Sequence, residues 1–258
     1  MHTDLTGYID VAQVTLYVFW VFFAGLIFYL RREDKREGYP LIFEDGNRGR
    51  GAGFPPFPGF KTYLVRHGEP ATLPRWSNDR RDAPVTPIAP WPGSPYVPTG
   101  NPMLDGVGPA SYADREDVPE LTMDDIPAIV PLRVATSITI EERDPDPRGM
   151  PVVGADGEVG GVVRDVWVDR AEMLIRYLEV EAAGASGRYV LLPMTMARIE
   201  VQRTSGRVLV QSILGRQFAD APVLANPDQV TKREEDRIVG YFGGGNLYAT
   251  AARQEPLL

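Results

Sequence analysis

Two carboxylates and an arginine occur close together in one stretch of the sequence, and groups of these types can take up and release protons. The stretch RDVWVDRAEMLIRYLEVE, residues 164–181, alternates apolar and polar residues on either side of a central break, as β-hairpins do. A turn at that break would bring Asp169, Glu172 and Arg176 together. Neighbouring carboxylates that are partly removed from water have raised, coupled pKa values, which a nearby arginine lowers again. The spacing alone leaves a second interpretation open, which is an ordinary solvent-exposed hairpin end.

A second stretch has residue types suited to phosphoryl transfer. YLVRHGEP, residues 63–70, resembles the Arg-His-Gly-Glu signature of the histidine phosphatases and phosphoglycerate mutases, in which the histidine accepts the phosphoryl group. That chemistry also needs a second histidine and an α/β sheet. The chain has only His2 besides His67, and the residues around His67 are rich in proline. We therefore expect a surface turn here.

Other kinds of chemical site have little material in this sequence. With no cysteine and two histidines, carboxylates would have to supply most ligands of a metal ion, and we predict no metal site. The run GYFGGGN, residues 240–246, lacks the Lys and Ser/Thr of a phosphate-binding loop, which indicates structural glycines. A formal net charge of −8 argues against nucleic acid as a partner, because phosphate binding needs a basic face.

The hairpin belongs to a region of short alternating runs that begins at about Val134. Turn signals such as Asp156-Gly157 and Ser205-Gly206 separate the runs at intervals of roughly ten residues. This pattern predicts a mainly-β domain, in the form of a small antiparallel barrel or sandwich. A short helix is expected near the C-terminus, with Thr231 as its N-cap and Gly243–Gly245 as its stop.

A single apolar run near the N-terminus has the length of a transmembrane helix. Residues 11–30 carry no charge, and a helix of that length crosses the ~30 Å hydrocarbon layer. Asp10 precedes the run in the position of an N-cap. A cleavable signal peptide is the alternative, but the run lacks a basic leader and a cleavage site of small residues.

The basic residues beside this run predict its orientation. Arg31, Arg32, Lys35 and Arg36 follow the run and no Lys or Arg precedes it, so the N-terminus is expected outside and the bulk of the chain in the cytoplasm. The absence of cysteine fits a reducing compartment.

A proline-rich segment separates the apolar run from the β region. It holds fourteen of the 24 prolines, between Pro40 and Pro109, so it should be extended or turned. A disordered linker is the simple interpretation, yet such linkers contain few aromatic residues and this segment has several, including Trp76 and Trp91. We therefore expect it to lie on the surface of a large partner.

Several blocks along the chain resemble the H subunit of the purple bacterial photosynthetic reaction centre. They occur in the same order as in that family, and they are FWVFFAGLIFYL, REGYPL, PTGNPMLDGVGPASY, DVPEL, WVDRAEMLIRYLEVE, LLPM and EEDRIVGYFGGGNLYA.

The resemblance implies a single-pass subunit of the bacterial photosynthetic inner membrane, with a cytoplasmic photoreaction-centre barrel and no catalytic centre of its own. Such a subunit caps the quinone side of the pigment-binding L and M chains and helps to deliver protons to the secondary quinone. Bacteriochlorophyll, bacteriopheophytin, quinones, non-haem iron and carotenoid would be held by partner chains. Antenna-ring subunits, a cytochrome subunit and membrane lipids are further expected partners. The implied segments are a periplasmic N-terminus (1–10), the transmembrane helix (11–31), the extended segment (32–109) and the barrel domain with its C-terminal helix (110–258).

The resemblance also implies roles for residues of the hairpin. Glu172 would be the relay of a proton path toward the quinone pocket, with Asp169 beside it and Arg176 holding the local charge. The best-known family members have a histidine pair after the PEL motif, whereas this chain reads TMDDIPAIVP there. Either Asp124 or Asp125 then takes up protons at the surface, or protons enter elsewhere. A membrane-anchored barrel scaffold for another partner is the alternative function.

Overall fold

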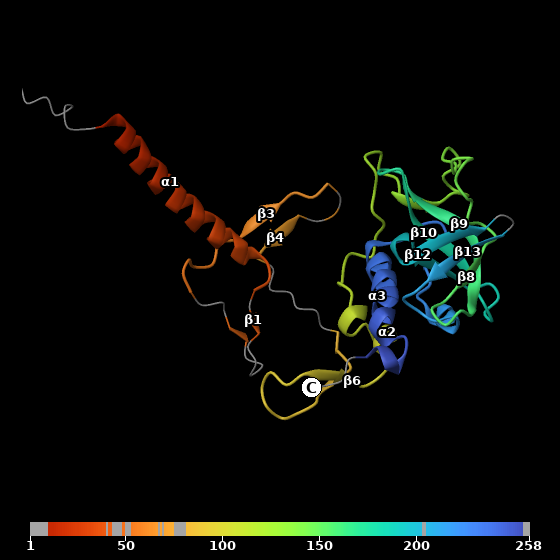
Figure 1. Cartoon of the computed structure of the whole chain (residues 1–258). Helices are drawn as coiled ribbons and strands as arrows, with labels where there is room; N and C mark the ends of the chain where they lie inside the picture. Colours follow the sequence, from red (N-terminus) through yellow and green to blue (C-terminus); the bar gives the residue numbers. More distant parts are fainter. Residues whose placement is uncertain are drawn as a thin grey trace, which may run out of the picture. The chain divides into compact units, whose positions relative to one another are not determined.

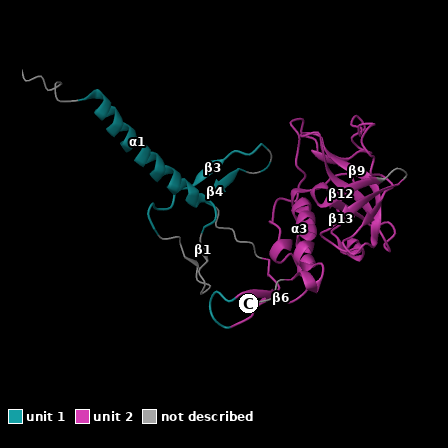
Figure 2. Cartoon of the chain, in the orientation of Figure 1, with its two compact units in different colours: residues 1–80, 90–94 teal, residues 81–89, 95–258 magenta. Residues whose placement is uncertain are grey.

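The structure is a computed structural model, and its chain divides into two compact units (Figure 2). One unit comprises Met1–Arg80 with Pro90–Ser94, and the other comprises Arg81–Ala89 with Pro95–Leu258. We call them the helix unit and the barrel unit and describe each by itself. The structure describes residues 10–39, 41–42, 48–49, 53–66, 68, 70–74, 81–202 and 205–254.

The helix unit begins with α1, Val11–Glu33 (Figure 1). Asp10 caps it as predicted, because its carboxylate accepts a hydrogen bond from the Ala12 N–H at 2.9 Å. Arg31 and Arg32 lie in the last turn, where positive charge favours the helix dipole. None of its residues is buried within the chain, and α1 is long and apolar enough to cross a membrane.

Two basic residues that follow α1 are buried rather than free. Lys35 and Arg36 lie in the short helix η2, Asp34–Arg36. The Lys35 ammonium donates to the carbonyl oxygens of Gly53 and Pro55, at 3.0 and 2.5 Å, and the Arg36 guanidinium donates to Gly59 O at 2.6 Å. Prolines have no N–H group, so the proline-rich residues around Pro55 have more backbone carbonyls than N–H donors. The two cations supply the missing donors. The unit also has two short antiparallel pairs, which are β1 (Leu41–Ile42) with β2 (Arg48–Gly49) and β3 (Lys61–Tyr63) with β4 (Ala71–Leu73).

The barrel unit is built on a seven-stranded sheet, which confirms the prediction of a mainly-β domain. Its order is β11-β10-β9-β8-β13-β12, with β7 paired to β9, and all pairs are antiparallel except β13 with β8. The described strands do not close into a barrel, because β11 and β12 are the two ends of this order. The strands are β7 (Ile129–Pro131), β8 (Pro151–Val153), β9 (Val159–Asp169), β10 (Leu174–Ala182), β11 (Tyr189–Pro193), β12 (Ala197–Gln202) and β13 (Ser205–Val210).

Turns and short elements complete this unit. Asp156 and Gly157 form the turn between β8 and β9, as predicted. Ser205 and Gly206, by contrast, are the first residues of β13 rather than a turn. The short elements are β5 (Val85–Pro87), β6 (Tyr96–Pro98), α2 (Pro102–Asp105), η3 (Gly108–Ala110), η4 (Met194–Met196), η5 (Gly215–Asp220) and η6 (Ala251–Arg253).

The predicted C-terminal helix is α3, Lys232–Tyr248, which lies beside the sheet and α2 (Figure 1). Thr231 caps it in a capping box with Glu234. The prediction that Gly243–Gly245 stop the helix is wrong, since α3 continues through them. Gly244 and Gly245 are there because α3 packs closely: an added Cβ would lie 2.5 Å from the Ala110 Cβ and 2.4 Å from Ser212 O, respectively.

Candidate functional site

The predicted hairpin is formed by β9 and β10, with Asp169 paired to Leu174 at its end. The Asp169 carboxylate organises the turn, because its Oδ1 accepts the N–H groups of Ala171 and Glu172 at 2.8 and 3.1 Å. The Asp169 carbonyl accepts the Met173 N–H at 2.8 Å, and Met173 has a positive φ of 56°. The hydrogen bonds therefore hold a turn that the backbone of Met173 alone would disfavour.

The structure brings Asp169, Glu172 and Arg176 together, as the sequence predicted. Arg176 Nε lies 3.3 Å from Asp169 Oδ2, and Arg176 Nη2 lies 3.3 Å from a Glu172 carboxylate oxygen. Their exposures differ, since the Asp169 side chain is 5% exposed and the Glu172 side chain 56%. Burial alone would lower the pKa of Arg176, but the two carboxylates outweigh it and raise that pKa. Arg176 therefore stays charged between them.

Asp124 and Asp125 lie in an exposed turn that is closed by the Thr122 N–H donating to Ile126 O at 2.8 Å. Arg170 joins this turn's end to the hairpin, because its N–H donates to Ala128 O at 2.9 Å and its guanidinium donates to Pro127 O. The two predicted surface carboxylates and the hairpin turn are thus connected through Arg170. The roles of all five predicted residues remain predictions.

A further carboxylate, Glu235 of α3, was not predicted from the sequence. Tyr177 of β10 donates its hydroxyl to Glu235 at 2.8 Å. Burial raises the pKa of Glu235, and the charge of Glu120 adds to this, while Tyr177, Arg176 and Arg115 act in the opposite direction. Glu235 is therefore the group at this site that holds a proton more readily than an ordinary carboxyl.

One cavity of about 530 Å³ is lined by Arg176, Tyr177 and Glu235. Its walls come from β10, α3 and the segments around residues 109–120. Arg176 and Glu235 both line it, so the half-exposed guanidinium of the hairpin and the half-buried carboxyl of α3 face one water-accessible space. The charged and hydroxyl-bearing residues that line it are Ser111, Tyr112, Arg115, Glu120, Arg176, Tyr177, Glu235 and Asp236.

Comparison with known families agrees with the sequence blocks. Residues 3–134 match the photosynthetic reaction centre H-chain N-terminal region, and residues 140–217 match the PRC-barrel domain. The chain belongs to the photosynthetic reaction centre H-chain family. The resemblance stated from the sequence is thereby confirmed. Membership and the apolar helix α1 together indicate a membrane-anchored protein that assembles with other reaction-centre subunits.

In this H-chain protein the hairpin lies within the matched barrel domain, whereas α3 and Glu235 lie beyond both matched ranges. The segment that contains Asp124 and Asp125 lies at the end of the H-chain region. The candidate site therefore combines residues from the H-chain region, the barrel domain and the C-terminal helix.

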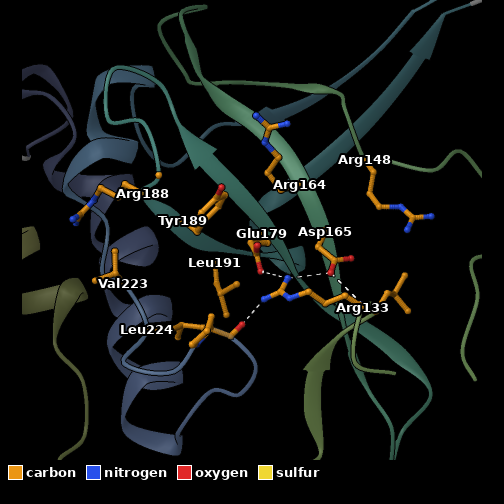
Figure 3. Close-up of a pocket in the computed structure, with 13 residues that line it drawn as sticks. Arg133, Arg148, Arg164, Asp165, Glu179, Arg188, Tyr189, Leu191, Val223 and Leu224 are labelled. Carbon is orange, nitrogen blue, oxygen red and sulfur yellow. Dashed lines mark hydrogen bonds and ion pairs between the residues drawn. The ribbon is translucent and has the colours of Figure 1, made fainter. Parts of the chain in front are cut away.

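A different hollow of the H-chain barrel unit is a groove of about 980 Å³ (Figure 3). Arg133 lies at its centre, 3.1 Å from Asp165 and 2.8 Å from Glu179. The Trp167 indole N–H also donates to Glu179, at 2.8 Å. Arg148 pairs with Asp146, and Arg164 pairs with Glu181, so three of the four arginines that line the groove are paired with carboxylates.

The described residues contain no group of three or more His, Cys, Asp and Glu side chains that could hold a metal ion. His2 and His67, and with His67 the phosphatase-like motif, lie outside the described residues.

Proposed function

We propose that this chain is the H subunit of a photosynthetic reaction centre, which caps the quinone side of the L and M chains and helps to deliver protons to the secondary quinone. The match to the H-chain N-terminal region over residues 3–134 carries the proposal. The chain has no independent catalytic role in it. Partner chains hold bacteriochlorophyll, bacteriopheophytin, quinones, non-haem iron and carotenoid, and antenna-ring and cytochrome subunits are further partners.

In this proposal α1 spans the photosynthetic inner membrane, with residues 1–10 in the periplasm and the bulk of the chain in the cytoplasm. The basic residues at the C-terminal end of α1 support this orientation. The segment 32–109 lies over the partner chains and the domain 110–258 covers their quinone side. The carbonyl-binding cations Lys35 and Arg36 support an ordered course for the start of that segment.

The end of the β9–β10 hairpin is the surface that docks on the partner chains in this proposal, and its exposed apolar residues support this. Met173 is 68% exposed and Leu174 is 40% exposed, and both adjoin Glu172 in the turn. The neighbouring turn exposes Met123 and Ile126, at 81% and 43%. Large apolar side chains gathered around charged ones are typical of protein interfaces. A partner on this surface would remove Glu172 from bulk water.

Proton delivery is needed because reduction of a buried quinone adds negative charge in a medium of low dielectric constant. The bound quinone of the partner chains is the acceptor of these protons. On this chain, Asp124 and Asp125 would take up protons at the surface and Glu172 would pass them inward. Glu235 would hold a proton in reserve because burial raises its pKa. Asp169 accepts three hydrogen bonds, so its part is to position the turn and Arg176.

The test is flash-induced proton uptake in the assembled complex carrying Glu172→Gln or Glu235→Gln. An amide keeps the shape of the side chain but cannot carry a proton, so uptake coupled to the second electron should slow by about tenfold or more. The first light-driven charge separation should not change. Glu181→Gln is the matched control, since Glu181 lies on the same hairpin and pairs with Arg164 instead.

Unchanged uptake in both variants would remove this chain from the proton path. A colourless complex without quinone would instead favour the scaffold function.

A further inference from the structure

A small cavity of the barrel unit is lined by two arginines that have no carboxylate partner among the described residues. Its volume is about 140 Å³, and its walls come from α2, the residues after η5, the residue before β11, and α3. Arg188 and Arg237 both line it. A space of this size holds several water molecules or one small molecule.

Arg188 is held at the cavity by one hydrogen bond, from its Nη2 to Ala221 O at 2.8 Å. Its Nε is buried and has no acceptor among the described residues. Figure 3 shows Arg188 beside Val223, on the opposite side of the large groove from Arg148. Arg188 and Val223 each line both the small cavity and the large groove.

Arg237 projects from α3 and is exposed. Its guanidinium makes no hydrogen bond or ion pair within the described part of the chain. Eight other arginines in the described part of the barrel unit pair with carboxylates, whereas Arg170 and Arg253 donate to carbonyl oxygens. Those within 4.0 Å of a carboxylate are Arg115, Arg133, Arg148, Arg164, Arg176, Arg198, Arg207 and Arg233.

The other polar groups of the cavity leave its net charge positive. Asp220 is the one carboxylate of the lining, against two guanidinium groups. Tyr241 donates its hydroxyl to Gln217 O at 2.7 Å, and burial raises its pKa, so it stays neutral. The Arg81 guanidinium lies over the ring of Tyr112, another lining residue, 4.3 Å from its centroid.

We propose that this cavity is a binding site for a small oxyanion, held between the guanidinium groups of Arg188 and Arg237. Guanidinium groups offer several N–H donors in a plane, which suits phosphate and carboxylate oxygens. An oxyanion here could accept hydrogen bonds from both guanidinium groups, including the buried Arg188 Nε that has no acceptor among the described residues. The single carboxylate of Asp220 offsets only part of their positive charge. This anion site shares no residue with the proposed proton path, and it does not depend on the proposed function of the chain.

The test is isothermal titration calorimetry, in which the purified full chain is titrated with inorganic phosphate at constant ionic strength. Saturable binding with one phosphate per chain is expected. Arg188→Gln and Arg237→Gln should each weaken it by about tenfold, because each removes a charge-assisted contact. Acetate in place of phosphate distinguishes a site for planar carboxylates from one for tetrahedral anions.

Two further variants make the outcome decisive. Asp220→Asn removes the opposing charge and should tighten phosphate binding, while Arg164→Gln, on the same unit but paired with Glu181, should leave it unchanged. Near-ultraviolet circular dichroism checks that each variant is folded. The proposal is overturned by the absence of saturable binding of either anion, or by equal losses in Arg188→Gln and Arg164→Gln. It is also overturned by weaker binding in Asp220→Asn, because removal of a negative charge beside the site must tighten the binding of an anion held there.

Discussion

At the scale of single residues, the candidate site separates two kinds of carboxylate. Asp169 is buried, and its oxygens accept hydrogen bonds from two backbone N–H groups and from Arg176. Glu235 is partly removed from water and has one hydrogen bond, from a tyrosine hydroxyl. The hydrogen bonds of Asp169 fix the geometry of the turn, whereas the burial of Glu235 favours a bound proton on its carboxyl group.

The stability of the protein should therefore depend on pH through Glu235. Its pKa in the folded state is raised above the ordinary value of 4.5. The folded state then binds this proton more tightly than the unfolded state, so the stabilisation is present below pH 4.5 and is lost as pH rises through the folded pKa. Glu235→Gln has no carboxyl group at this position, so it does not lose this stabilisation. Its free energy of unfolding, relative to that of the unaltered protein, should therefore increase from pH 4.5 to neutral pH.

Urea denaturation of both proteins at the two pH values measures this difference. The titratable groups that face Glu235 are Tyr177, Glu120, Arg176 and Arg115, and all of them are kept in the variant. A free-energy difference that is the same at both pH values would contradict the raised pKa.

The sequence predicted the residues of the hairpin but not Glu235, and the reason is the range of the contacts. Asp169, Glu172 and Arg176 meet through one turn, so alternation along two strands is enough to place them. Tyr177 and Glu235 are 58 positions apart and meet only because α3 packs on the sheet. The local capping-box pattern accounts for Glu234, but the sequence does not say that its neighbour Glu235 turns toward Tyr177.

At the scale of elements, close packing overrides local preference in α3. The glycine run favoured a stop, since glycine weakens helices. The structure instead uses Gly240, Gly244 and Gly245 where the helix approaches other backbone closely, and Gly243 faces only an ordinary contact, 3.6 Å from Pro109 O. The helix start was predictable because a capping box is local, whereas its end depends on what it packs against.

Gly244→Ala and Gly243→Ala should therefore have opposite effects. At Gly244 the new Cβ would lie 2.5 Å from the Ala110 Cβ and 3.0 Å from the Ala110 Cα, and the strain should lower the free energy of unfolding by about 1–3 kcal/mol. At Gly243 there is room, and the better helix propensity of alanine should raise it by up to ~1 kcal/mol. Thermal unfolding followed by circular dichroism compares the two. Equal effects would show that the contact with Ala110 does not determine this part of α3.

At the scale of the whole molecule, the two units differ in how they are stabilised. The buried hydrophobic cluster lies wholly within the barrel unit, from Met103 to Phe242. In the helix unit, α1 buries none of its residues within the chain, and η2 is held by hydrogen bonds from buried cations to carbonyls. The sequence predicted this division from the apolar run and the alternating runs. It did not predict that Lys35 and Arg36 are buried, because the positive charges that set orientation were expected to face water.

A fragment of residues 81–258 should therefore fold without the membrane helix. It keeps every strand of the sheet, α2, α3 and the complete hydrophobic cluster, so burial of Trp167, Phe218 and Phe242 can still drive folding. The fragment should stay in solution without detergent and unfold cooperatively in urea, with the near-ultraviolet circular dichroism of packed aromatic side chains. A fragment of residues 1–80 is the matched comparison and should need detergent, because the side chains of α1 find no cover within the chain. If the 81–258 fragment lacks a cooperative transition, the barrel unit depends on the helix unit or on partner chains for its stability.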